Sequence, residues 1–237
     1  MTENGRLNVG IIGAGPVGCV LGRALASAGH IIVGIASTDE RNLERADALM
    51  PGVKAMAPHD LIELADLVLI AIPSAEVAGF VAGAAAAGLW RQGQLVAHTA
   101  GEFGIEVLQP ASDAGAIALA IHPAMAFTGT SVDIAHLHES FFAVAAPTIA
   151  LPIAQALVIE MGAEPIVIEP ASRAAYFEAV SVAQSFSAMI VNQSIGLLES
   201  IGIESARGVI GPVIRSSVDA ALRDGHVDVD PDELLES

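Results

Sequence analysis

Short runs of β-branched and other apolar residues alternate with longer stretches rich in Ala and Leu through roughly the first 170 residues. This alternation is typical of a parallel sheet whose strands are connected by helices. The run Asp66–Ile72 is almost continuously apolar, as expected of a strand covered on both faces. We expect strands at Leu7–Ile12, Ile31–Ser37, Leu67–Ile72, Gln94–His98, Ala116–Ile121, Phe141–Ala145 and Pro165–Ile168.

The pattern changes near Pro170, after which no strand is indicated. Residues Ser172–Ile201 predict one long helix, and a second helix is expected from about Ser205 to Arg223, after Gly202. The acidic tail Val227–Ser237 is expected to be frayed.

No internal repeat or flexible linker interrupts the chain. We therefore expect an α/β domain with a doubly wound, mostly parallel sheet over residues 1–169. A small all-helical domain over residues 170–237 should follow it.

A glycine-rich segment follows the first expected strand. Gly13, Gly15 and Gly18 have GxGxxG spacing and open a helix, which is the context in which this motif binds a dinucleotide. The first glycine permits a tight turn, the second lets the backbone approach a pyrophosphate, and the third lets the helix pack close to the sheet. Together with Pro16 and Val17 they form a candidate cofactor site, and a turn without a ligand is the weaker alternative.

The end of the second expected strand should set the choice of cofactor. Ser37, Thr38 and Arg41 supply hydroxyls and a positive charge that suit a 2′-phosphate, so NADP is favoured over NAD. Asp39 could instead bind a ribose hydroxyl, which keeps NAD as the alternative. A third interpretation is that this segment only caps the next helix.

Four motifs, read in order, resemble those of a known family. They are Asp66–Pro73, Val96–Gly101, Ile121–Phe127 and Arg173–Tyr176, and their order resembles an uncharacterised family of Rossmann-like oxidoreductases with a helical C-terminal domain of unknown function. That family is similar in plan to pyrroline-5-carboxylate reductase, prephenate dehydrogenase and 6-phosphogluconate dehydrogenase. The resemblance covers about residues 7–225.

The resemblance implies a Rossmann fold, a nicotinamide cofactor and a site between the sheet and the helices. It adds Ile72, Pro73 and Thr99, which lie in the shared motifs, to the expected cofactor contacts. We therefore expect an NADP-dependent oxidoreductase that exchanges hydride with a small carbonyl, imine or alcohol substrate.

The chain departs from the family at three positions. Members usually carry Ser where this chain has Ala100, and His and Asn where it has Phe177 and Ser185. Each departure removes a polar group from the expected substrate side. The alternative is therefore a dinucleotide-binding protein that has lost catalysis and acts as a sensor or assembly partner.

His122 is the main candidate for proton exchange. It is expected to follow the strand Ala116–Ile121 at the edge where parallel sheets bind ligands, and Pro123 stiffens the turn. Imidazole exchanges protons near neutral pH, and prephenate dehydrogenase is similar in placing a His-Pro pair there. The alternative is that His122 only hydrogen-bonds the backbone, as we expect of His98.

A polar stripe follows one face of the long helix. Glu178, Ser181, Ser185 and Asn192 share this face, so Glu178 and Ser185 join His122 as candidate catalytic residues. The stripe either lines a pocket or forms a solvated edge. Tyr176 lies in a neighbouring row, where packing is the more common role.

Charge and composition narrow the function classes. The chain has 10 Lys and Arg against 27 Asp and Glu, so its charge of −17 disfavours nucleic acid and membrane surfaces as partners. Its one lysine, Lys54, lies outside the long helix, which argues against the lysine-dependent reduction used by some enzymes of this plan. His136 and His138 lack metal-ligand spacing, so no metal is expected.

The sequence also predicts the cellular location and the assembly of the protein. The single Cys19 fits a reducing compartment, and Arg23 interrupts the apolar run that imitates a signal peptide, so a cytoplasmic protein is expected. Pro and Glu within Ala71–Trp90 and Phe141–Met161 argue against membrane spans there. The helix Ser172–Ile201 is largely apolar around its circumference, which predicts a homodimer.

Overall fold

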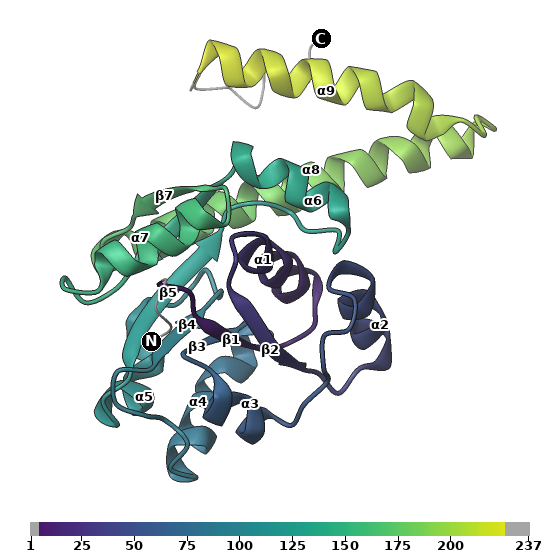
Figure 1. The fold of residues 1–237 in the computed structure, drawn as a ribbon. Coiled ribbons are helices and arrows are strands. Elements are labelled where there is room, and N and C mark those ends of the chain that lie inside the picture. The colour runs from purple at the N-terminus through teal and green to yellow at the C-terminus, as the bar shows by residue number, and fades with distance from the viewer. Residues whose placement is uncertain (1–4, 226–237) are drawn as a thin grey trace. The chain divides into compact units, whose positions relative to one another are not determined.

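The structure, a computed structural model, describes residues 5–225 and contains one seven-stranded sheet (Figure 1). The strand order is β2-β1-β3-β4-β5-β6-β7. The expected α/β fold class is confirmed, with strand ends that differ from prediction by one or two residues. The strands are β1 (Asn8–Ile12), β2 (Ile31–Ala36), β3 (Leu67–Ile70), β4 (Leu95–His98), β5 (Ile117–Pro123), β6 (Phe141–Ala145) and β7 (Glu164–Val167). The tail Val227–Ser237 lies outside the described residues.

One strand pair breaks the parallel pattern. β5 and β6 pair antiparallel, whereas every other neighbouring pair is parallel. This pairing carries β5 on to Pro123 and places His122 opposite Ala143. The expectation that the strand ends at Ile121, with His122 in a following turn, was wrong because the antiparallel partner extends the ladder.

Two hydrophobic cores lie on opposite faces of the sheet, because successive strand residues point to opposite sides. In β3, Leu67 and Leu69 join one core, and Val68 and Ile70 join the other. Figure 1 shows α1, α6 and α7 on one side and α3, α4 and α5 on the other. The elements of this part are α1 (Pro16–Ser27), α2 (Glu40–Leu49), α3 (Pro58–Leu64), α4 (Ser74–Ala86), η1 (Ile105–Leu108), α5 (Gln109–Asp113), α6 (Ser131–His136), η2 (Leu137–Glu139), α7 (Leu151–Glu160) and η3 (Pro170–Ser172).

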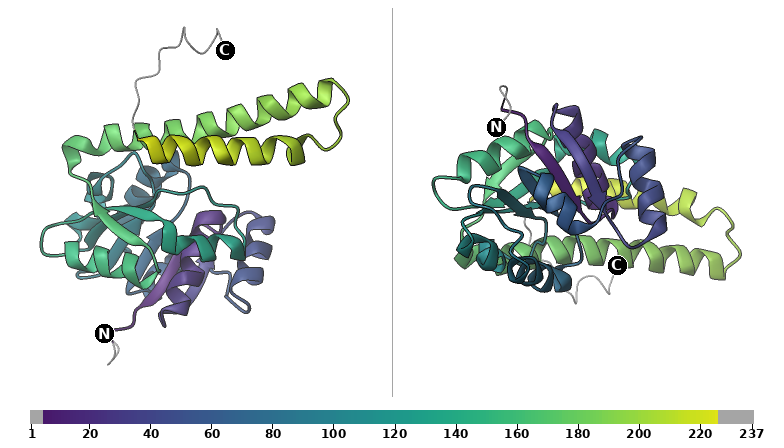
Figure 2. Two further views of the ribbon diagram at one scale, coloured as in Figure 1. Left: turned by 90° about the horizontal axis from the view of Figure 1, so that it is seen from above. Right: turned by 60° about the horizontal axis from the view of Figure 1, so that its bottom comes forward.

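Two long helices follow the sheet, α8 (Arg173–Ser200) and α9 (Ala206–Asp224), connected by a short loop (Figure 2). The chain divides into two compact units within α8, the first ending at Glu178 and the second beginning at Ala179. The boundary expected between residues 169 and 170 stays a prediction. Among the described residues, Pro170–Ser200 is the one helical stretch that is long and apolar enough to cross a membrane, by length and composition.

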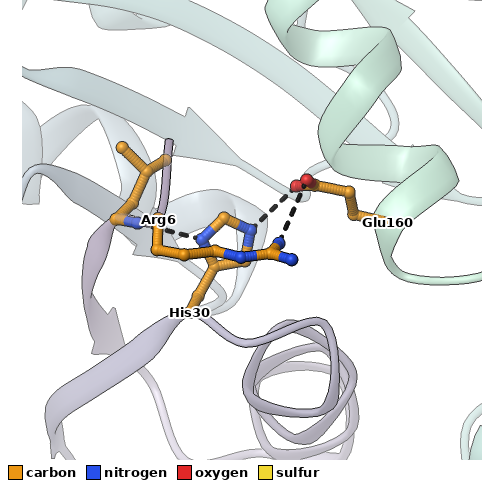
Figure 3. Close-up of polar contacts among 4 residues, drawn as sticks. Arg6, His30 and Glu160 are labelled. Atoms are coloured by element: carbon orange, nitrogen blue, oxygen red, sulfur yellow. Dashed lines mark hydrogen bonds and ion pairs between the residues drawn. The ribbon is translucent and has the colours of Figure 1, made fainter. Parts of the chain in front are cut away.

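A buried histidine connects three elements at the edge of the sheet where β1 and β2 begin (Figure 3). The Leu7 N–H donates to His30 Nδ1 at 3.1 Å, so that nitrogen carries no proton. The proton is on Nε2, which lies 2.8 Å from Glu160 Oε2 at the end of α7. Glu160 also accepts from Arg6 Nη1 at 3.3 Å. His30 therefore ties β1 and β2 to α7.

We predict that His30→Ala lowers the free energy of unfolding by about 2–4 kcal/mol, because it leaves a cavity and an unpaired Leu7 N–H. Urea denaturation followed by far-UV circular dichroism measures the change. His59→Ala is the matched control, since the His59 side chain is 65% exposed, and it should change the free energy by less than about 0.5 kcal/mol. Equal effects of the two substitutions would contradict this role for His30.

Candidate functional site

The glycine-rich turn between β1 and α1 leaves backbone N–H groups without hydrogen-bond partners among residues 5–225. Gly13 has φ of 106°, and a Cβ at Gly18 would lie 2.1 Å from the Gly13 carbonyl oxygen, so both positions require glycine. Gly15 caps α1 in an extended conformation without a side-chain hydrogen bond, and Pro16 opens the helix. The Val17 and Gly18 N–H groups, in the first turn, therefore remain free for an anion.

A cavity of about 870 Å³ opens beside this turn. It lies at the carboxyl ends of β1, β2 and β3, the edge where open α/β sheets bind ligands. Seven of the predicted cofactor residues line it. They are Gly13, Gly15, Pro16, Ser37, Thr38, Ile72 and Pro73.

Other predicted cofactor residues lie outside the cavity lining. Arg41 is exposed, and its backbone N–H donates to Asp39 Oδ1 at 3.0 Å, so the segment also caps α2. The Thr99 N–H donates to the Ile70 carbonyl at 3.1 Å, which continues the ladder between β3 and β4. Val17 and Gly18, in the first turn of α1, are also absent from the lining.

One apolar part of the cavity lining was not predicted. It consists of Met56 and Ala57, which precede α3, Pro58, which opens α3, and Phe80 of α4. The Met56 N–H donates to the Ile35 carbonyl at 3.0 Å, which holds this segment against β2. Nothing in its sequence marks it as a ligand contact. Because its lining combines the glycine-rich turn with apolar side chains, the cavity suits a nucleotide.

A second group of side chains gathers around His122. Its Nδ1 lies 2.8 Å from the Tyr176 hydroxyl, and the two rings meet edge to face at 5.6 Å. Gly101 lies against the other side of the imidazole, where an added Cβ would be 2.7 Å from both His122 Nε2 and Phe177 Cδ2. Nδ1 of His122 is therefore engaged by Tyr176, whereas Nε2 has no hydrogen-bond partner among the described residues.

Arg173, the first residue of α8, is 4% exposed and holds the loop after β4. Its Nε donates to the Gly101 carbonyl at 2.8 Å and its Nη2 to the Ala100 carbonyl at 3.3 Å. Its Cζ lies 5.7 Å from the centroid of the Tyr176 ring. The buried Nη1 has no hydrogen-bond partner within the described part of the chain.

Burial sets the protonation states here. It lowers the pKa of His122 to about 4, and the positive charge of Arg173 acts in the same direction. Burial raises the pKa of Tyr176, while the positive charge of Arg173 opposes that rise. At neutral pH, His122 is therefore a neutral imidazole and Tyr176 a protonated phenol.

His98 supports the same loop, as expected for it. The ring is fully buried, its Nε2 lies 2.7 Å from the Gly104 carbonyl, and its Nδ1 accepts from the Ala100 N–H at 3.2 Å. Burial lowers its pKa to about 4, so it is neutral. Both histidine nitrogens are used by the backbone.

The two candidate catalytic residues of the polar stripe on α8 are exposed, unlike His122. Glu178 is exposed, and no hydrogen bond joins its side chain to another described residue. Ser185 is exposed in the second unit. The first unit instead brings Tyr176 and Arg173 to His122. Both lie in the motif that opens α8. Their spacing of three residues places them on one helix face, and this spacing was the sequence signal that could have identified them together.

Comparison with known proteins places the chain in a family. The Rossmann-like domain family matches residues 2–123, and a domain of unknown function (DUF2520) matches residues 140–229. The second match begins just before β6, so it includes two strands of the sheet as well as the helices. None of the curated proteins matches the chain.

Solved structures share the fold at low identity. A Bacteroides fragilis protein, provisionally assigned as an NADP oxidoreductase, matches with a TM-score of 0.76 and 18% identity over 95% of this chain and 82% of its own. 1-Pyrroline-5-carboxylate reductase from Streptococcus pyogenes matches with a TM-score of 0.65 and 16% identity over 98% of this chain and 84% of its own. 3-Hydroxyisobutyrate dehydrogenase from Mycobacterium tuberculosis matches with a TM-score of 0.60 and 19% identity over 86% of this chain and 70% of its own. The chain therefore belongs to the Rossmann-like domain family and carries a domain of unknown function after it, as the order of its motifs indicated.

Proposed function

We propose that this protein is an NADP-dependent oxidoreductase that exchanges hydride with a small carbonyl, imine or alcohol substrate. The observation that carries the proposal is the cavity at the carboxyl ends of the strands, which is lined by the glycine-rich turn that opens α1. Proteins of the same fold support it, since one is named a pyrroline carboxylate reductase and another a hydroxyisobutyrate dehydrogenase. Titration with NADPH, followed by a panel of carbonyls and imines, tests it.

The residues present fit a dinucleotide. Val17 and Gly18 would bind the diphosphate through their N–H groups, and Ser37 and Thr38 would bind the phosphorylated ribose. The slot beside Phe80 would hold the adenine ring. The bound nicotinamide supplies the hydride acceptor or donor. The protein's own task is then to orient substrate and to move the proton near His122.

The charge state of His122 favours proton acceptance at neutral pH. A neutral imidazole takes the proton that an alcohol loses as its carbon loses hydride. Reduction of a carbonyl is the reverse of this step. With a pKa of about 4, His122 releases an accepted proton readily.

Phe177 favours a second candidate function. Its ring lies edge to face with His122 at 6.4 Å, where related proteins of the resembled family carry a polar side chain. This packing fits a dinucleotide-binding protein that senses its ligand without catalysis. A protein that binds NADPH and turns over none of the panel would favour this alternative.

We predict that NADPH binds more tightly than NADH, because Ser37, Thr38 and Arg41 supply donors and charge for the 2′-phosphate. Arg41→Ala should reduce the preference roughly tenfold, the scale of one charged hydrogen bond. Calorimetric titration with each cofactor measures it. Arg23→Ala, an exposed arginine on α1, is the control and should leave the ratio unchanged. Equal affinities in the wild type would refute the NADP preference.

We predict that His122→Ala lowers turnover by about 100-fold or more while NADPH affinity changes little, because His122 lies away from the glycine-rich turn. Steady-state kinetics and cofactor titration measure the two quantities separately. A purely structural His122 would instead lower the melting temperature, with turnover falling only as far as folded protein is lost. Wild-type turnover in a folded His122→Ala variant would exclude the role.

We also propose a homodimer built on α8. The helix presents a series of large apolar side chains that are about half exposed. Burial of such a face against its symmetry mate is the common way to remove it from water. These residues are Val182, Phe186, Met189, Ile190 and Leu197.

Light scattering at micromolar concentration should give twice the chain mass of 24.1 kDa. Met189→Glu should shift the protein toward monomer, because it places a charge in the proposed interface. Asn192→Glu, on the polar stripe of the same helix, is the control and should leave the dimer intact. A monomeric wild type would refute the dimer. If the protein sediments together with lipid vesicles, the apolar helix binds a membrane instead.

A further inference from the structure

We infer that the side-chain amide of Asn42 binds the 2′-phosphate of the cofactor, and that Arg45 holds this amide in place. The inference rests on the proposed function and deepens it, because it assigns residues that distinguish NADP from NAD. Both residues lie on α2. The observation behind it is a hydrogen bond between the two side chains at the wall of the cavity beside the glycine-rich turn.

Asn42 lines the cavity of about 870 Å³ together with Ser37, Thr38 and Asp39. This part of the lining follows the end of β2, where a dinucleotide-binding sheet contacts the ribose of the adenosine half. Arg41, a candidate for the 2′-phosphate from the sequence, is absent from the lining. A group that chooses between NADP and NAD must reach this part of the cavity, and Asn42 lies there.

The bond to Arg45 determines which end of the Asn42 amide is free. Arg45 Nη1 donates to Asn42 Oδ1 at 2.6 Å. A guanidinium only donates, so the amide oxygen is the atom that faces Arg45. The NH2 group of the amide has no hydrogen-bond partner in residues 5–225. Asn42 therefore keeps two N–H donors for an acceptor in the cavity.

The neighbouring polar side chains are engaged by the turn that opens α2. The Ser37 hydroxyl accepts from the Asp39 N–H at 3.2 Å and donates to the Asp39 carbonyl at 3.4 Å. Asp39 Oδ1 accepts from the Arg41 N–H at 3.0 Å and so caps the helix. Thr38 and Asn42 are thus the residues of this part of the lining whose side-chain donors have no partner within the described chain.

Arg45 adds a positive charge behind the amide. Its side chain is half-buried, and no carboxylate lies within 4 Å of its guanidinium in the part of the chain that the structure describes. Burial raises the pKa of Cys19 on α1 to about 11, and the positive charge of Arg45 opposes that rise. The charge therefore acts on both α1 and α2, and it offsets the Asp39 carboxylate in the lining.

A phosphate fits this pair better than a ribose hydroxyl does. A phosphate presents negatively charged acceptor oxygens, which bind N–H donors more strongly than a neutral oxygen does. NAD has a hydroxyl at the same position, which a carboxylate usually binds in proteins of this fold. The pair should therefore contribute to the affinity for NADPH and contribute little to the affinity for NADH.

The first test is Asn42→Asp, which keeps an oxygen for Arg45 and replaces the NH2 group by a negatively charged oxygen. We expect the Kd for NADPH to rise about tenfold or more and the Kd for NADH to change by less than about twofold, as calorimetric titration measures. Adenosine 2′,5′-bisphosphate and AMP, which differ only in the 2′-phosphate, should show the same contrast. Ala48→Asp is the matched control, since it adds the same charge at an exposed position of α2 outside the cavity lining.

The outcomes separate the inference from the proposed function. An equal loss of affinity for NADPH and NADH in Asn42→Asp would place the amide at the diphosphate and overturn the inference. Wild-type affinity for both cofactors would also overturn it. The proposed function stands in either case, because the wild type still binds NADPH. A wild type that binds neither cofactor overturns both.

Arg45 is a positioning residue, and the ratio of the two cofactor affinities separates this role from a role in folding. Arg45→Met removes the donor and the charge, and we expect the preference for NADPH over NADH to fall about fivefold or more. Arg45→Lys keeps a charge and a donor, so it should retain most of the preference. A purely structural Arg45 would lower the melting temperature and leave the ratio unchanged. An unchanged ratio in a folded Arg45→Met variant would overturn the role assigned to Arg45.

Discussion

The candidate site depends on one buried cation. Arg173 donates to the carbonyls of Ala100 and Gly101 and so fixes the loop after β4 against the start of α8. This contact sets the distance between His122, on β5, and Tyr176, one turn farther along the helix. Burial of an arginine without a carboxylate partner costs free energy of folding. Proteins keep such a buried charge where it contributes to function. Burial is the main reason that His122 is neutral, and the same guanidinium adds to this effect while it favours ionisation of the phenol.

Much of the fold could be predicted because its signals are local. A strand buried on both faces, such as Leu67–Ile70, reads as a continuous apolar run, and the glycine spacing reports a turn that only glycine can form. The position of His122 inside β5 could not be predicted, since it depends on β6 pairing in the opposite direction. The Tyr176 contact was missed for a similar reason. The two residues are 54 positions apart, and no local pattern joins them.

The two halves of the site differ in how they are built. The cofactor half consists largely of backbone, with glycines and free N–H groups whose geometry follows from a short motif. The half around His122 consists of side chains from β5 and α8 packed against the loop after β4. Departures such as Ala100 and Phe177 fall in this second half, where a single substitution changes chemistry without disturbing the fold. A shared fold therefore says more about the cofactor than about the substrate.

The antiparallel step from β5 to β6 also bears on where this protein can be divided. The two family matches end and begin between residues 123 and 140, yet the hydrogen bonds of one sheet continue across that gap. A chain cut there would leave β5 with an unpaired, apolar edge, which other chains can pair with. The limits of sequence families and the limits of cooperative folding thus fall at different places. For this protein, the shortest piece that could evolve or be exchanged as a unit includes strands from both matches.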